Sequence, residues 1–306
     1  MTNKTTAATL CALGGNAIFG FSFMFSRIAL GVATPFVMLT YRFILAVLGL
    51  SIAAVWSVNR KNPPRESEDF MRFDLRSKPV LPLLCLGIVQ PVAYFFCESY
   101  GIAMTNSTFS GVIIALVPIV GLILGAVCLH ERATARQVVW SLVSIAGVVV
   151  MTLMQSAEGA VRLPGVLLLF GAVLSGVVFN IISRSIADRF SAFERTYVMM
   201  LIAAAAFTLL AVVENRADLS ALLAPLQSLP FMGAMVYLSL VSSIGAFLML
   251  NFANNHLPVA KTTAFCNLTT VISVFAGVMF LGEPFNLTML IAAAMIVLGV
   301  WKVQKG

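Results

Sequence analysis

The sequence predicts an all-α integral membrane protein with ten transmembrane helices, arranged as two inverted five-helix repeats. Three observations lead to this prediction. The 306 residues are 60% hydrophobic and only 10% charged, with a mean hydropathy of +1.00, whereas soluble domains carry about 25% charged residues. The apolar residues gather in windows of about 20, long enough to cross a hydrocarbon core of about 30 Å. The two halves also repeat one pattern of residues in the same order.

This composition excludes an ordinary cytosolic enzyme, a secreted disulfide scaffold and a disordered protein, because a soluble chain so poor in charge would expose a large apolar surface. The net charge of +7 is spread over short loops between apolar windows, so nucleic acid is not an expected partner. The cysteines lie within apolar windows without metal-ligand spacing, so we expect buried free thiols and no metal or cofactor. They are Cys11, Cys85, Cys97, Cys128 and Cys266.

Ten apolar windows are bounded by turn or charge signals, and each predicts a membrane-spanning helix. The first window is too long for the core of a signal peptide and is expected to be a retained helix. Alternating strands of the β-barrel type are not seen in the sequence. The windows cover residues 8–29, 34–57, 80–103, 107–129, 136–155, 164–184, 191–213, 230–253, 258–281 and 285–303.

The distribution of basic residues predicts a multi-pass protein of the cell membrane with both termini in the cytoplasm. Ten crossings place both ends on one side. If that side is cytoplasmic, only three basic residues face outward (Arg27, Arg162 and Arg216) and one, Arg42, lies inside a span. All other lysines and arginines then lie on the inner side, as the positive-inside rule requires.

Two registers relate the halves, which we place at residues 8–155 and 164–303. Because each half has five spans, an odd number, the second is expected to be inserted upside down, an arrangement that lets one central site face either side. An offset of 152 pairs Gly125 with Gly277, Leu129 with Leu281, Glu131 with Glu283 and Gly147 with Gly299. An offset of 156 pairs Gly15 with Gly171, Gly20 with Gly176, Phe23 with Phe179 and Tyr41 with Tyr197.

Two closing segments and one opening pattern resemble EamA-type repeats of the drug/metabolite transporter superfamily. They are LILGAVCLHERATARQVVWSLVSIAGVVV (122–150), VFAGVMFLGEPFNLTMLIAAAMIVLGV (274–300) and GNAIFGFSFMFSRIAL…P…YRFILA (15–46). The resemblance covers residues 8–303. It implies a ten-helix transporter with a central cavity between the halves, commonly exporting amino acids or other small metabolites. One departure is His130 in the first half where the second half has Gly282, which affects the geometry of that turn.

Polar residues inside the spans are candidates for the transport site, because a charge at the bilayer centre costs at least about 2.5–3.5 kcal/mol. Features shared by both halves, such as Glu131 and Glu283, are interpreted as helix-start or turn anchors. Gln90, Tyr94 and Glu98 are unshared and are spaced i, i+4, i+8, so they share one helix face. Their counterparts in the second half are Ser242, Ala246 and Leu250.

Arg42 and Glu98 lie at similar depths, about 12 and about 8 Å from the outer ends of their spans, which permits an ion pair. Two interpretations stay open. In the first, the stripe is one wall of a polar cavity, where Arg42 meets a substrate carboxylate and Glu98 carries a coupling proton. In the second, the Arg42–Glu98 pair is a structural clamp.

Further candidates for substrate binding lie in the second half. Thr263 and Asn267 share one face of the ninth span, near Lys261, which is expected to reach back to the cytoplasm. Asn180 and Tyr197 either contribute to the site or bond a neighbouring helix.

A secondary-active transporter that exports small metabolites such as amino acids accounts for these features best, and its partners are a small-molecule substrate and the lipid bilayer. Proton-coupled efflux of drugs or organic cations is the alternative; a phosphorylated-metabolite exchanger would need more cavity cations than Arg42 and Lys261. An enzyme is not expected, because every Asp lies in a loop or at a span end and the sequence has neither H-E-x-x-H nor a P-loop. A monomer and a homodimer both stay open.

Overall fold

The computed structural model describes residues 3–58, 75, 78–128, 134–157, 161–257, 265–283 and 285–304, and these residues contain helices and no strand. Within them, seven helices are long and apolar enough to cross a membrane. Three shorter apolar helices cover Ala135–Met151, Leu268–Leu281 and Leu287–Lys302. The all-helical, multi-pass class is therefore as predicted, while ten crossings stay a prediction.

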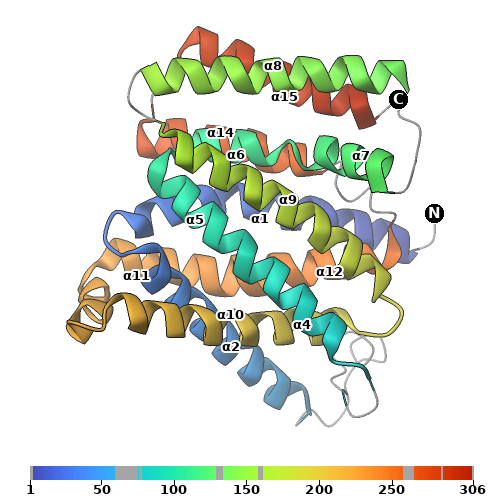
Figure 1. Ribbon diagram of the computed structural model, residues 1–306. Helices are drawn as coiled ribbons and strands as arrows, with labels where there is room; N and C mark the ends of the chain where they lie inside the picture. The colour runs from blue at the N-terminus through green and yellow to red at the C-terminus, as the bar shows by residue number, and fades with distance from the viewer. Residues whose placement is uncertain are drawn as a thin grey trace.

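Helix lies in each of the ten predicted windows (Figure 1). The first half contains α1 (Asn3–Leu30), α2 (Pro35–Val58), α4 (Leu81–Gly87), η1 (Ile88–Ala93), α5 (Tyr94–Met104), α6 (Ser107–Ile114), α7 (Val117–Cys128) and α8 (Ala135–Ala157). The second half contains α9 (Leu163–Ser185), α10 (Ala192–Glu214), η2 (Leu219–Leu222), η3 (Ala224–Gln227), α11 (Leu229–Val236), η4 (Tyr237–Ala246), α12 (Phe247–His256), α14 (Cys266–Leu281) and α15 (Leu287–Gln304).

Local sequence signals set several helix ends. Asn106 caps α6 by accepting a hydrogen bond from the Phe109 N–H at 2.8 Å, as short polar residues do before a helix. Ser191 and Glu194 form a reciprocal capping box at the start of α10. Gly282, with φ +63°, follows α14 in the left-handed conformation that glycine tolerates best. It turns the chain so that Glu283 follows directly at the helix end.

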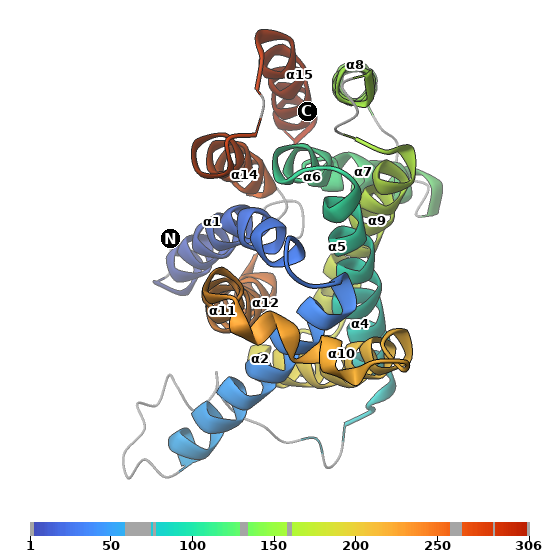
Figure 2. The ribbon, with the colours of Figure 1, turned by 90° about the vertical axis from the view of Figure 1, so that its left-hand side faces the viewer.

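The helices α8 and α15 pack against each other at one edge of the bundle, away from α2 and α10 (Figures 1 and 2). Their contact is reciprocal. A Cβ on Gly147 would meet Ala292 O and Ile296, and a Cβ on Gly299 would meet Trp140 O and Ser144. The repeat offset of 152 residues relates the residues of the first contact to those of the second. The C-terminal part of α8 lies against the N-terminal part of α15. The two helices therefore run antiparallel about a local two-fold axis, held close by glycine.

The candidate spans Leu81–Met104 and Leu229–His256 are both interrupted by a π-helical stretch. In the first half this stretch is η1, where Gln90 has a non-helical φ of −145° and ψ of +121° next to Pro91. In the second half it is η4. The 152 offset places residues 88–93 on residues 240–245, inside η4, so the two interruptions occupy equivalent positions. π-Helical stretches inside longer helices are frequent at functional sites.

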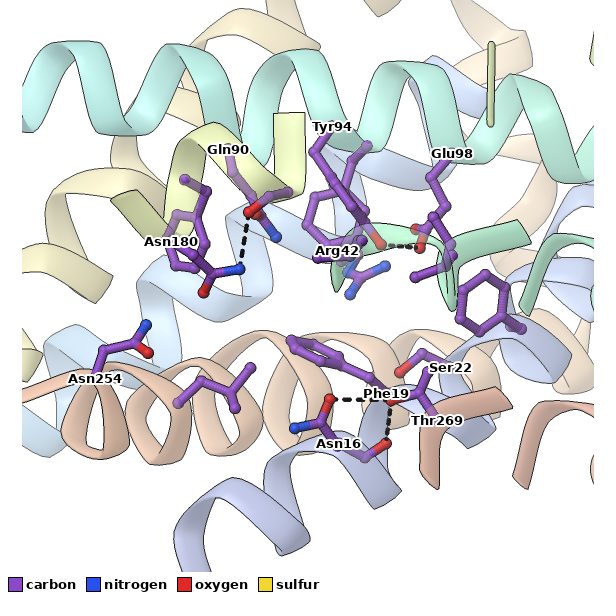
Figure 3. Close-up of a pocket in the computed structure, with 17 residues that line it drawn as sticks. Asn16, Phe19, Ser22, Arg42, Gln90, Tyr94, Glu98, Asn180, Asn254 and Thr269 are labelled. Atoms are coloured by element: carbon purple, nitrogen blue, oxygen red, sulfur yellow. Dashed lines mark hydrogen bonds between the residues drawn. The ribbon is translucent and has the colours of Figure 1, made fainter. Parts of the chain in front are cut away.

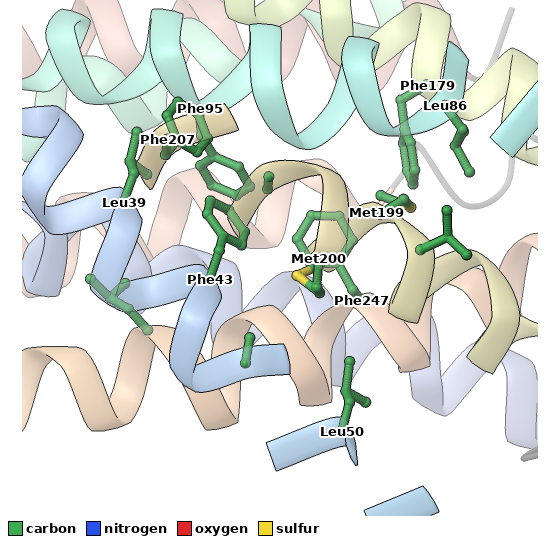
Figure 4. Close-up of a cluster of buried hydrophobic side chains, with 14 of the residues drawn as sticks. Leu39, Phe43, Leu50, Leu86, Phe95, Phe179, Met199, Met200, Phe207 and Phe247 are labelled. Atoms are coloured by element: carbon green, nitrogen blue, oxygen red, sulfur yellow. The ribbon is translucent and has the colours of Figure 1, made fainter. Parts of the chain in front are cut away.

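A cluster of buried aromatic and aliphatic side chains joins α2, α5, α9, α10 and α12 (Figure 4). The rings of Phe43 and Phe207 stack with centroids 5.7 Å apart, and Phe95 lies 5.4 Å from Phe43 and 6.1 Å from Phe247. Phe95 and Phe179 also line the cavity described below. The cluster therefore supports the wall of that cavity from behind.

Candidate functional site

A cavity of about 80 Å³ lies inside the bundle, and both halves of the chain line it (Figure 3). Its polar lining residues are Asn16, Ser22, Arg42, Gln90, Tyr94, Glu98, Asn180, Asn254 and Thr269. Its apolar lining residues include Phe19, Phe23, Phe95, Ile114, Val117, Phe179 and Leu250. Since about 10–15 Å³ of such space holds one water molecule, the cavity has room for several waters.

Arg42 of α2 is fully buried and reaches the cavity with a guanidinium held by three contacts. Its Nε donates to Ser243 Oγ at 2.8 Å and its Nη2 donates to Ser242 Oγ at 3.0 Å. Its Cζ lies 4.1 Å from the centre of the Phe95 ring, a distance typical of a cation–π contact. The remaining nitrogen, Nη1, is buried and has no hydrogen-bond partner among the residues that the structure describes.

Glu98 of α5 supplies the opposite charge. It is 6% exposed, and its Oε1 accepts a hydrogen bond from the Tyr94 hydroxyl at 3.1 Å, one helical turn away. The ion pair with Arg42 that the sequence permitted is not formed: among the described residues, no Arg42 nitrogen lies within 4.0 Å of a Glu98 oxygen. The serines of η4 hold the guanidinium instead.

Gln90, Tyr94 and Glu98 follow one wall of the cavity, as their spacing predicted, and Asn16, Ser22 and Asn254 lie on the opposite wall (Figure 3). On that side Thr269 of α14 donates to Asn16 O at 2.9 Å and lies 3.1 Å from Asn16 Oδ1. These bonds join α1 of the first half to α14 of the second.

Two side-chain oxygens at the cavity, Gln90 Oε1 and Asn254 Oδ1, are buried and have no hydrogen-bond partner within the described part of the chain. Together with Arg42 Nη1 they make three unpartnered polar atoms around one small space. Buried polar groups are otherwise nearly always hydrogen-bonded, because leaving one unpaired costs about 1–3 kcal/mol. The cavity is therefore suited to a polar ligand or to water.

Comparisons with known proteins agree with this architecture. The sequence profile described as "EamA-like transporter family" matches residues 6–153 and 163–303. The chain belongs to the EamA-like transporter family. It is thus a multi-pass membrane transporter, as the resemblance of its two halves predicted.

Among the relatives of this EamA-family chain, the uncharacterized transporter YcxC of Bacillus subtilis (strain 168) is 28% identical over 301 residues, which cover 97% of this chain and 93% of the relative. An uncharacterized transporter of Archaeoglobus fulgidus is 22% identical over 76% of this chain and 80% of its own length. A crystal structure described only as that of a protein aligns with a TM-score of 0.65 at 19% identity, over 96% of this chain and 94% of the other, and shows the same fold.

The predicted substrate-binding residues of this EamA protein divide into three groups. Arg42, Gln90, Tyr94, Glu98 and Asn180 lie around the cavity. Tyr197 is not among the described residues that line it; its hydroxyl lies 3.0 Å from Ser51 Oγ on α2, as the neighbouring-helix interpretation expects. Thr263 and the side chain of Asn267 lie outside the described residues.

Four polar lining residues were not predicted: Asn16, Ser22, Asn254 and Thr269. The repeat comparison could have found them. Their counterparts at offsets of 156 or 152 are Ala172, Val178, Ile102 and Val117, all apolar. Gln90 and Glu98 were selected because each is a polar residue whose counterpart in the other repeat is apolar or small. The same criterion, applied to every span, selects these four residues as well.

Glu283, a residue shared by both halves, is a helix anchor as predicted. Its Oε1 accepts hydrogen bonds from the Ser107 N–H and hydroxyl at 2.8 Å, and its Oε2 accepts one from the Thr108 N–H at 2.8 Å. A carboxylate is stabilising at a helix N-terminus, here that of α6, because unpaired N–H groups point outward there. The equivalent Glu131 lies outside the described residues.

A second polar network is buried between α9, α10 and α12, beyond the cavity. Arg195 is fully buried and donates to Ser183 O at 2.8 Å, to Ser183 Oγ at 2.6 Å and to Asn251 O at 2.8 Å, and it also contacts Asn255. The distribution of basic residues places Arg195 on the inner side, near the start of the predicted span 191–213. The structure places it inside the protein, where it ties three helices of the second half together.

Proposed function

We propose that this EamA-family chain is a secondary-active transporter that exports small metabolites, amino acids in particular, across the cell membrane by alternating access. The observation that carries the proposal is the cavity between the halves, where Arg42 and Glu98 present opposite charges that are not paired with each other. A zwitterion offers a carboxylate to the first and an ammonium group to the second. Charged pairs of this kind are strong in a site that excludes water.

Inverted repeats with ten crossings are the architecture that this mechanism needs. Three features of the fold support them. The α8–α15 contact is antiparallel and reciprocal, the π-helical stretches η1 and η4 fall at equivalent positions, and α1 begins at the same end of the bundle at which α15 ends (Figure 1). The basic residues favour the cytoplasm for that end.

The volume of the cavity indicates how substrate would enter. Space for several waters is too small for an amino acid together with its hydration, so the surrounding helices have to part on one side at a time. In transporters with inverted repeats, helices interrupted near the membrane centre form the substrate-binding site and bend during transport. The interrupted spans η1 and η4 both adjoin the cavity through Gln90 and the Arg42–Ser242 bond.

Proton-coupled efflux of organic cations is the second candidate function. The aromatic lining, with Phe19, Phe23, Tyr94, Phe95 and Phe179 around a single carboxylate, favours it, because aromatic faces attract cations. Exchange of phosphorylated metabolites is disfavoured, since Arg42 is the one cationic side chain among the described residues that line the cavity.

Counterflow into proteoliposomes tests the proposal. Vesicles preloaded with one unlabelled compound receive the same compound in labelled form, over panels of amino acids, organic cations and sugar phosphates. We expect uptake above that of protein-free vesicles for at least one amino acid, and a reduced rate for Gln90→Ala. Uptake of organic cations alone would favour the second function, and uptake of no compound in the three panels would contradict both.

A further inference from the structure

The bonds that hold Arg42 come from the other half of the chain. The guanidinium belongs to α2, while Ser242 and Ser243, its two hydrogen-bond acceptors, belong to η4. Ser242 Oγ also lies 2.8 Å from the hydroxyl of Ser22 on α1. Three segments distant in sequence thus meet at one charged group.

The same geometry keeps Arg42 close to Glu98 but out of contact with it. The Arg42 guanidinium lies over the ring of Phe95, and Phe95 precedes Glu98 by three residues on α5, so the two side chains share a helix face. Opposite charges in a poorly hydrated space attract each other strongly. Arg42 and Glu98, which face one cavity, therefore need a competing interaction to stay separate.

We propose that Ser242 and Ser243 are positioning residues of the transport site, which hold the Arg42 guanidinium away from Glu98 so that each charge stays available to one end of a substrate. Only the part of the inference that concerns substrate binding rests on the proposed function. The separation of the two charges is a property of the empty protein and can be measured without any ligand.

The position of the serines in the repeat supports this role. Ser242 is the counterpart of Gln90, and both lie in the equivalent π-helical stretches. In the first half this position contributes Gln90 directly to the cavity lining. In the second half the same position contributes a hydroxyl that orients Arg42. The η1 interruption thus supplies Gln90 to the cavity lining, and the η4 interruption holds the Arg42 guanidinium in the same cavity.

Removing the hydroxyls predicts a specific rearrangement. In the double variant S242A/S243A the guanidinium loses both of its hydroxyl acceptors. Its Nη1 has no acceptor among the described residues even in the native protein. A buried charge left short of partners is strongly unfavourable, and Glu98 is the carboxylate that shares its cavity. We expect Arg42 to turn to Glu98 and form the ion pair that the native protein avoids.

A double-mutant cycle measures this pairing. Thermal midpoints are recorded in detergent for the native chain, Glu98→Gln, S242A/S243A and the triple variant. Because Glu98 is not paired with Arg42 in the native protein, we expect Glu98→Gln to lower the midpoint by about 2–4 °C more in the serine-free background than in the native one. Equal shifts in both backgrounds would overturn the proposal.

Ser239→Ala is the matched control. Ser239 lies in the same η4 stretch and is fully buried, and no described residue hydrogen-bonds its hydroxyl, so its removal should leave the effect of Glu98→Gln unchanged. S242T/S243T keeps both hydroxyls and should restore the native pattern. If S242A/S243A does not fold, Ser243→Ala alone, which removes the shorter of the two bonds, replaces it in the cycle with the same two outcomes.

Transport separates this inference from the proposed function. For an amino acid that the native chain carries, we compare its transport rate with that of the corresponding decarboxylated amine. The ratio of the two rates should be at least ten-fold lower in S242A/S243A than in the native chain, because the amine does not need Arg42. A merely structural defect would lower both rates together, and an unchanged ratio counts against positioning. If the native chain carries no compound of the panels, the proposed function fails, while the thermal cycle still decides the role of the serines.

Discussion

The carboxylate of Glu283, which follows α14, caps the helix that begins at Ser107 in the opposite half of the chain. Glu283 reaches this position because Gly282 turns the chain after α14. Gly277 lets the two helices approach, since a Cβ there would meet Glu283, Thr108 and Ser107. One shared motif, a glycine six residues before a glutamate, therefore joins the two halves at this end of the bundle.

We expect Glu283→Gln to lower the stability of the purified transporter by about 0.5–2 kcal/mol, the range for a lost helix cap. The amide keeps one acceptor oxygen but loses the charge and the second acceptor for the Thr108 N–H. Thermal unfolding in detergent measures the change. Glu214→Gln is the control: Glu214 also accepts bonds from distant residues, Thr34 and Tyr100, but is exposed, where such contacts contribute little. A larger effect at Glu214 would contradict the assigned cap.

The reciprocal α8–α15 contact predicts that Gly147→Ala and Gly299→Ala are both destabilising, by about 1–3 kcal/mol each, because the added methyl meets a backbone carbonyl that cannot move aside. Gly233→Ala is the control. A Cβ on Gly233, in α11, meets nothing within 4 Å, so alanine should be neutral or slightly stabilising there. Thermal midpoints of the three variants decide; a stable Gly147→Ala protein would show that the two helices do not pack as described.

The aromatic cluster predicts a large loss of stability for Phe43→Ala. Its ring is fully buried and contacts the rings of Phe95 and Phe207, so its removal should cost about 3–5 kcal/mol. Phe280→Ala is the comparison, since Phe280 is 64% exposed on the outside of the bundle. Denaturation in mixed detergent should separate the two variants clearly, and similar losses for both would contradict the placement of the core.

Arg42→Lys is expected to reduce transport at least ten-fold although the charge is kept. Lysine cannot donate to Ser242 and Ser243 together, and it lacks the flat guanidinium that lies on Phe95. Arg27→Lys is the control, because Arg27 does not line the cavity that holds Arg42, and its Nη1 donates to Ile102 O. Initial rates of counterflow compare the two. Full activity of Arg42→Lys would remove Arg42 from the site.

The periodicity of the sequence predicted what depends on one helix at a time. The apolar windows located the helices, and the i, i+4, i+8 spacing placed Gln90, Tyr94 and Glu98 on one wall of the cavity. The repeat comparison singled out Glu283 as an anchor, because a residue needed by the scaffold recurs in both halves.

Contacts between distant segments were beyond such reasoning. Depth alone permitted an ion pair between Arg42 and Glu98. The rotation of α2 about its own axis and the interrupted geometry of η4 decide the partners of Arg42, and neither can be read from residue spacing. The positive-inside count placed Arg195 on the inner side, near the start of the predicted span 191–213, but could not show that it is buried. Its position one turn into α10 shows its burial only once α9 and α12 are packed around it.

Glu98→Gln tests whether this carboxylate carries the coupling proton. Glutamine keeps the shape of the side chain and still accepts the bond from the Tyr94 hydroxyl, but it cannot take up and release a proton. If Glu98 is the coupling site, counterflow at equal pH should persist in Glu98→Gln, while accumulation driven by an imposed pH gradient should be lost. Tyr94→Phe is the control, because it removes the hydrogen bond and leaves the carboxyl group, so accumulation should still respond to the gradient. Accumulation that responds to the gradient in Glu98→Gln would assign the proton to another group. Loss of counterflow together with accumulation is the result expected if Glu98 binds the substrate ammonium group, as proposed above, because exchange at equal pH needs no net proton movement.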